Sequence, residues 1–144
     1  MTLASNSAEF YRAVRGIVRA DHAMVPVQDG VYYFEVEFKG VSGAGYVSYF
    51  RLHSKLINKV HREIGVGFCE EHAETDAMLG HKEAAWGYHG DDGCIFGVDH
   101  RIGSGLPYGP KYSEGDIVGC GVNFDKGTVF YTLNGKVLGQ FSPS

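Results

Sequence analysis

The sequence predicts an all-β protein, an antiparallel β-sandwich, and three features carry that prediction. The 144 residues include 21 glycines, which suit tight turns between short strands and would cost a helical protein conformational entropy. Aromatic residues and valines are plentiful, whereas helix formers are sparse. Strand-sized apolar segments are separated by clusters of Gly, Pro and Asp, a spacing typical of sandwiches. The length fits a single domain over residues 1–144.

The first strand is expected at residues 32–38, where apolar and acidic residues alternate. Phe34, Val36 and Phe38 fall on one face, and Glu35 and Glu37 fall on the other. This alternation is typical of a half-buried strand in an antiparallel sheet. Two shorter strands are expected at 64–68 and 86–88.

Two segments do not have a strand pattern. Residues 41–63 are long for a connection between neighbouring strands, and we interpret them as an insertion outside the sandwich. Within them, 49–61 has the apolar spacing of a short amphipathic helix. Residues 70–83 are polar and are expected to form a loop or a single helical turn.

The C-terminal third predicts a three-stranded meander over 116–123, 128–133 and 136–141. A turn at 125–127 separates the first two strands. Asn134-Gly135 separates the last two, and this pair favours a type I′ hairpin because both of its central residues need positive φ. The alternation of apolar with polar or small residues in these strands and the first one predicts six mostly buried side chains: Phe34, Val36, Val118, Val122, Val129 and Tyr131.

Several motifs, in order along the chain, carry a family resemblance. They are VRADH at 18–22, GVYYFEV at 30–36, WGYHGDDG at 86–93, PYGP at 107–110, GDIVGC at 115–120 and TVFYTLNGKVLG at 128–139. Together they resemble a SPRY domain of the Ran-binding-protein-M-like type, and secreted SPRY effectors of plant-parasitic nematodes are similar. The resemblance implies a bent β-sandwich that recognises a protein or peptide through loops at one end. It also implies a scaffold or adaptor role, in some members linked to ubiquitin ligases, or an effector role.

By this resemblance the binding loops map to residues 7–12, 70–81 and 88–92. Tyr108 is added as an amphipathic side chain of the kind enriched at interfaces. The expected partner-binding residues are therefore Arg12, Glu70, Glu71, His72, Met78, His81, Tyr88, His89, Asp91, Asp92 and Tyr108.

The chain departs from the family pattern in its length. The insertion at 41–63 is about twenty residues longer than the family connection, and family members continue beyond Ser144 through further strands. We therefore expect an incomplete C-terminal sheet edge that invites dimerisation, since unpaired edges pair with other chains. Alternatively, the chain is a fragment that needs flanking sequence to fold.

Charge and hydropathy argue against several partners. The net charge is −4 and the Lys and Arg residues are scattered, so no phosphate-binding surface and no nucleic-acid partner is expected. No apolar run approaches the ~20 residues that span a bilayer, and no membrane partner is expected. The polar N-terminus and three widely spaced cysteines predict a protein of the cytoplasm, or of both cytoplasm and nucleus, or an effector in the host cytoplasm whose leader is missing.

The chemistry-bearing residues leave one alternative, a metal-binding protein or enzyme that uses His and Cys. Cys69 and His72 have a plausible ligand spacing, with His81, His89 and Cys94 downstream. Asp91 and Asp92 suit a turn better than a calcium loop. Cys94, His89 and Asp91 lie within six positions on one turn, which rarely supplies the base, orienting group and oxyanion hole of a nucleophilic site. Trp86 is interpreted as a core residue, with a peptide groove as its alternative. The sequence favours a non-enzymatic protein without a cofactor.

Overall fold

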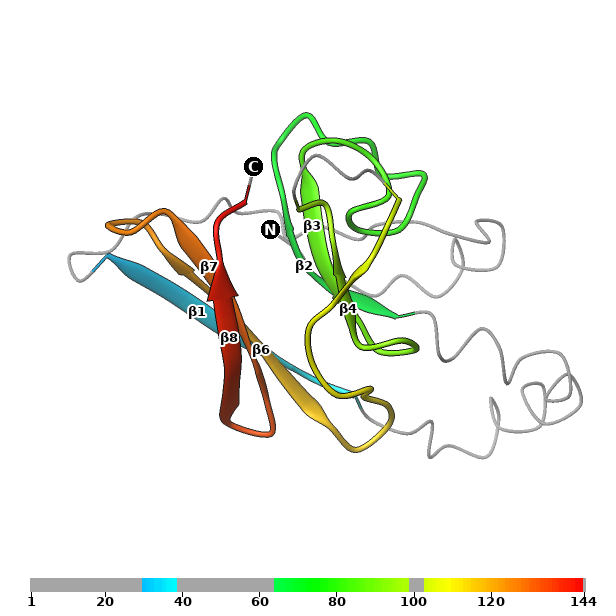
Figure 1. The fold of residues 1–144 in the computed structure, drawn as a ribbon, viewed down its shortest axis with the longest axis vertical. Coiled ribbons are helices and arrows are strands. Elements are labelled where there is room, and N and C mark those ends of the chain that lie inside the picture. Colours follow the sequence, from blue (N-terminus) through cyan, green and yellow to red (C-terminus); the bar gives the residue numbers. More distant parts are fainter. Residues whose placement is uncertain (1–29, 39–63, 99–102, 144) are drawn as a thin grey trace, which may run out of the picture.

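The computed structural model describes residues 30–38, 64–98 and 103–143, which form two four-stranded antiparallel sheets (Figure 1). The first sheet has the order β1-β6-β7-β8, with β1 at Val31–Glu37, β6 at Ile117–Asn123, β7 at Thr128–Leu133 and β8 at Lys136–Phe141. The second has the order β2-β3-β4-β5, with β2 at Gly65–Cys69, β3 at Ala85–His89, β4 at Cys94–Phe96 and β5 at Leu106–Pro107. The described residues contain no helix, and the predicted all-β sandwich is confirmed.

Three expectations fall on residues that the structure does not describe. These are the helix at 49–61, the insertion at 41–63 and the binding loop that contains Arg12. Within the described part, the sequence missed β4 and β5, because strands of three and two residues are too short to show alternation.

The first sheet has the faces that the sequence predicts. β1 pairs with β6 from Val31 opposite Asn123 to Glu37 opposite Ile117. Val36, Val118, Val129 and Tyr131 are buried between the sheets. Phe34 and Val122 are only half-buried, although both pack against the same core.

The hairpin between β7 and β8 has the predicted turn. Asn134 and Gly135 both have positive φ, +50° and +79°. The Asn134 side chain also holds the neighbouring strand: its Oδ1 accepts the Ile117 N–H at 2.9 Å and its Nδ2 donates to Asp116 at 2.9 Å. Asn is therefore selected at this turn both for its backbone conformation and for its side-chain amide.

Tyrosines occupy the centre of the sandwich. Tyr88 from β3 and Tyr131 from β7 have no exposed surface, and their rings lie 5.5 Å apart across the two sheets. The Tyr112 hydroxyl lies 2.9 Å from the Ile64 carbonyl and 2.6 Å from the Tyr88 carbonyl, and the Tyr88 hydroxyl donates to the Pro110 carbonyl. Hydroxyl groups therefore tie the connection between β5 and β6 to the second sheet.

Tyr108 joins the two sheets at an irregularity in the β7–β8 ladder. The strand register shifts between Tyr131 and Thr132. There the Tyr108 hydroxyl accepts the Tyr131 N–H at 3.0 Å and donates to the Gly139 carbonyl at 2.7 Å. A side chain that follows β5 thus replaces a direct bond between two strands of the opposite sheet.

Candidate functional site: the β2–β3 loop

The long connection between β2 and β3, residues 70–84, packs on the outer face of the second sheet. Its ends are joined by a hydrogen bond from the Glu70 N–H to the Ala84 carbonyl at 2.8 Å. Ala73, Leu79 and Ala85 form a small buried cluster under it. Leu79 lies directly over Gly87, where an added Cβ would come within 2.6 Å of the Leu79 Cβ. The glycine in β3 therefore lets the loop lie flat on the sheet.

The far part of the loop reaches the end of β3 through a stack of rings. The His89 ring lies 4.0 Å from the Phe96 ring and 5.5 Å from the His81 ring, close to parallel with both. The His89 Nε2 lies 2.8 Å from the Leu79 carbonyl and must carry the proton, because a carbonyl oxygen only accepts. Burial lowers the pKa of His89, which keeps the imidazole neutral.

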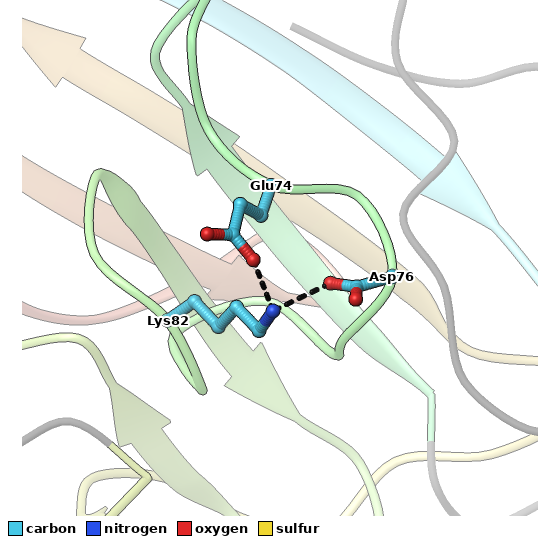
Figure 2. A network of polar contacts seen from close by, with 3 residues as sticks. All are labelled: Glu74, Asp76 and Lys82. Carbon is cyan, nitrogen blue, oxygen red and sulfur yellow. Dashed lines mark hydrogen bonds and ion pairs between the residues drawn. The ribbon is translucent and has the colours of Figure 1, made fainter.

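A recess of about 300 Å³ opens on this loop. It is lined by His72, Ala73, Glu74, Lys82, Glu83 and Ala84. Lys82 is held between two carboxylates, with Asp76 at 2.8 Å and Glu74 as the second partner (Figure 2). The hydrogen bonds with Asp76 and Glu74 raise the pKa of Lys82, and the bond with Lys82 lowers the pKa of Asp76.

Ala84, at the end of the recess, has φ of +60°. This left-handed conformation is uncommon for a residue with a Cβ, and such strain tends to occur where a site is held in shape. Sequence reasoning missed Ala84, Glu74 and Lys82. For Lys82 a signal existed, since it is the one cation among five carboxylates in residues 70–84.

The loops expected at one end of the sandwich emerge from opposite ends of β3, as Figure 1 shows. The loop with Glu70 and His81 precedes β3, whereas the turn with Asp91 and Asp92 follows it. This arrangement corrects the expectation of one shared end, because a strand separates the two connections that it joins. The stacking of His81 on His89 and the bond from His89 to the Leu79 carbonyl link the β2–β3 loop to the end of β3.

Among the expected contact residues, those of the β2–β3 loop are the most accessible. Glu70, Glu71 and His72 are exposed, and the His72 Nδ1 lies 3.4 Å from a Glu70 carboxylate oxygen. Met78 and His81 are half-buried.

In the turn after β3, Asp92 is exposed and its Oδ1 accepts the Cys94 N–H at 2.8 Å. Asp91 is half-buried, and its Oδ1 has no hydrogen-bond partner. The bond to Cys94 is what the turn interpretation predicts, because aspartates accept backbone N–H groups in tight loops.

Two of the expected contact residues, Tyr88 and His89, belong to the packed interior, and a third, Tyr108, is half-buried. Tyr88 is 0% and His89 is 2% exposed, so neither side chain can touch a partner directly. The alternation of β3 places Tyr88 in the core and His89 under the loop. The Tyr108 hydroxyl is already bonded on both sides within the sandwich. Burial corrects the expected contact role of Tyr88 and His89, whereas the contact role of Tyr108 stays a prediction.

The histidines, cysteines and aspartates considered for metal or nucleophilic chemistry do not form a common site. Among the described residues, no three His, Cys, Asp or Glu side chains are grouped so that they could hold a metal ion. The Nε2 of His89 is engaged by Leu79, and burial and the adjacent Asp92 raise the pKa of the Cys94 thiol. A raised pKa disfavours the thiolate, the form in which cysteine acts as a nucleophile. Trp86 packs against the core.

Comparison with known proteins decides the family, since the family model of the SPRY domain matches residues 31–142. The chain belongs to the SPRY family. It is 37% identical over 122 residues to Ran-binding protein 9 of Danio rerio, covering 85% of this chain and 17% of that protein. It is 31% identical over 127 residues to the Ran-binding protein M homolog of Arabidopsis thaliana, covering 87% of this chain and 22% of that protein.

A crystal structure of a human SPRY domain has the same fold, with a TM-score of 0.54 and 25% identity over 77% of this chain and 61% of that one. The family and the names of these relatives indicate a protein-interaction module and point to a non-catalytic domain. The chain spans less than a quarter of the length of the curated relatives given above. No helix in the described part is long and apolar enough to cross a membrane.

Proposed function

We propose that this SPRY domain binds a protein or peptide partner through the β2–β3 loop. The observation that carries the proposal is the recess in which Lys82 is held between Glu74 and Asp76 (Figure 2). The loop is supported from below by the buried Leu79, whose carbonyl is bonded to His89. A recess on a supported loop can bind without first ordering itself, which lowers the entropy cost of association.

The charge of the loop favours a basic partner surface. Residues 70–84 carry five carboxylates and one lysine, and that lysine is already paired with two of the carboxylates. A complementary positive surface would speed encounter and suppress acidic competitors. The proposed contact residues in this loop are the exposed Glu70, Glu71 and His72 and the half-buried Met78 and His81.

The decisive experiment compares affinity capture by wild type with capture by matched loop variants, quantified by mass spectrometry. Glu74→Gln and Lys82→Gln change the recess while keeping side-chain size. Lys126→Gln is the control, since Lys126 is exposed in the turn between β6 and β7 of the other sheet. We expect at least one protein to be retained by wild type and by the control and lost from both loop variants. Each variant must melt like wild type. If every captured protein binds all four chains equally, the loop is not the recognition surface.

The relatives are named for binding Ran, so Ran is the first candidate for a pairwise binding measurement.

We further propose a cytoplasmic scaffold or adaptor role, a single domain over 1–144 and a segment at 41–63 that is an insertion outside the sandwich. If this segment is an insertion, its replacement by a short Gly-containing turn should keep or raise the melting temperature. Among the described strands β8 pairs only with β7, and we propose that this edge supports dimerisation. Sedimentation that shows a monomer at all concentrations would refute the dimer.

A further inference from the structure

The outer face of the first sheet carries an aromatic surface that the loop site does not use. On an antiparallel sheet with one buried face, the outward positions are normally polar. Here β1 presents Val31 and Tyr33 outward, which are 36% and 40% exposed, and β8 presents Val137, which is 60% exposed. Phe130 of β7 lies beside Tyr33, with ring centroids 6.0 Å apart and the ring planes within 11° of parallel.

Two glycines in the strand between these rings make the surface flat. β6 lies between β1 and β7, and its outward positions include Gly119 and Gly121. An added Cβ at Gly121 would overlap the Phe130 ring, and one at Gly119 would overlap the Tyr33 hydroxyl. The two rings therefore lean over the middle strand from both sides and cover its backbone. We call Tyr33, Phe130 and Glu35 the aromatic platform.

Hydrogen bonds hold the platform in place before anything binds. The Tyr33 hydroxyl lies 2.8 Å from the Thr132 Oγ1 and donates to the Glu35 Oε1 at 2.9 Å. These bonds fix the Tyr33 ring and keep an exposed carboxylate next to it. Preorganised groups of this kind lose little entropy on binding.

The charges on this face select the partner. The outward positions of the four strands carry two carboxylates, Glu35 and Glu37, and no lysine or arginine. An aromatic face attracts cations through its quadrupole, and an adjacent carboxylate adds an ion pair. Arginine fits both features best, because its planar guanidinium stacks on a ring while its N–H groups bond a carboxylate.

We propose that the aromatic platform is a second docking site, which binds an arginine side chain from a basic, extended segment of a partner protein. The guanidinium stacks on Tyr33 and Phe130 and pairs with Glu35. This site lies on the sheet opposite to the one that carries the β2–β3 loop, so it does not depend on the proposed loop function. A partner that contacts both surfaces would gain from the effective concentration of the second contact.

In the test, the whole chain is titrated with a peptide of alternating arginine and serine that has blocked termini. Binding is monitored by nuclear magnetic resonance. We expect saturable shifts at Tyr33, Phe130 and Glu35. The same peptide with lysine should bind about threefold more weakly, because cation–π and stacking differences at exposed sites are small. Glu35→Gln and Phe130→Thr should each weaken binding about threefold or more on the same grounds. Glu35→Gln preserves the acceptor for Tyr33, so it remains informative even if Phe130→Thr folds poorly.

Glu114→Gln is the control, because it removes an exposed carboxylate from the connection between β5 and β6. Equal weakening by Glu114→Gln and Glu35→Gln would show that only net charge matters and would overturn the proposal. Equal binding of the arginine and lysine peptides would show that the guanidinium does not stack on the rings and would overturn the proposal. Shifts at Tyr33 and Phe130 that grow with protein concentration in the absence of peptide would assign the face to a second copy of the chain and would equally refute it.

Discussion

Removal of a single oxygen, in Tyr108→Phe, tests whether the two sheets are joined as the structure indicates. The substitution keeps the ring, which packs edge-on against Tyr88, Tyr131 and Phe141. It deletes the hydroxyl that accepts the Tyr131 N–H at 3.0 Å and donates to the Gly139 carbonyl at 2.7 Å. Both backbone groups then lose their partner at a point where the strand register is already shifted.

The loss in unfolding free energy depends on whether the Tyr131 N–H and the Gly139 carbonyl find new partners. A buried backbone group left without a partner costs about 1–3 kcal/mol, and two groups are affected. If β7 and β8 close up, Tyr131 can bond directly to Gly139 and recover part of the loss. We therefore expect about 2–3 kcal/mol of destabilisation, below the sum of two full penalties. For a domain of this size that corresponds to a fall in melting temperature of roughly 5–12 °C.

Urea denaturation with hydrogen exchange at the Tyr131 amide measures both parts of this expectation. The matched control is Tyr33→Phe, which also deletes one bonded hydroxyl but on the exposed face of the sheet. The control should lose less than Tyr108→Phe, because water can replace the bond to the exposed Glu35 and only the bond to the buried Thr132 goes unreplaced. If Tyr108→Phe unfolds at the same urea concentration as wild type and its Tyr131 amide stays protected, the bridging role is wrong.

Three further outcomes follow from the same core. Tyr131→Phe should leave stability unchanged or raise it by about 1 kcal/mol in urea titrations, because the buried Tyr131 hydroxyl has no hydrogen-bond partner; a loss above 1 kcal/mol would reveal a hidden partner. Gly67→Ala should cost roughly 2–3 kcal/mol, since the new Cβ would overlap the rigid Trp86 carbonyl, and a thermal melt like that of wild type would contradict the packing. Burial lowers the pKa of His89, so its contribution to stability is present above the ordinary pKa of 6.5 and is lost as the pH falls below it. Melts between about pH 7 and pH 5 should therefore fall less in His89→Gln than in wild type, and parallel curves would exclude His89 as the cause.

The strands that the sequence predicts correctly are those with a strong local signal. β7 and β8 coincide with the expected ranges, because their turn, Asn134-Gly135, has one favoured geometry and fixes the register of both strands. β1 differs from its expected range by one residue at each end, since alternation defines the face of a strand better than its limits. Local rules thus determine the first sheet.

The strands expected at 64–68 and 86–88 appear as β2 and β3, whereas β4, β5 and the site depend on contacts between distant residues, which local patterns do not encode. β4 and β5 are held by pairing with β3 and with each other over two residue pairs at each step. Tyr108 is predicted as a contact residue because tyrosine is amphipathic and enriched at interfaces, and that pattern carries no information about its partners in the sandwich. Its hydroxyl bonds depend on the register shift in the β7–β8 ladder, some twenty residues away. Likewise, the pairing of Lys82 with Glu74 and Asp76 requires the loop to fold back on itself.

Both candidate surfaces depend on glycine at an outward position of a central strand. In β3, Gly87 leaves room for Leu79, and the preceding β2–β3 loop covers the sheet with the chain's own residues. In β6, Gly119 and Gly121 leave room for Tyr33 and Phe130, which cover the strand backbone but remain open to solvent. An outward glycine in a central strand therefore has a different consequence in each sheet. One sheet bears a loop with a charged recess, and the other bears a flat aromatic face beside a carboxylate. Because the loop is tied to its sheet by His89 and the platform by Thr132, each surface is rigid before a partner arrives. Specificity then depends on the charges beside each surface. These are acidic in both cases: the carboxylates of residues 70–84 at the loop, and Glu35 and Glu37 at the platform.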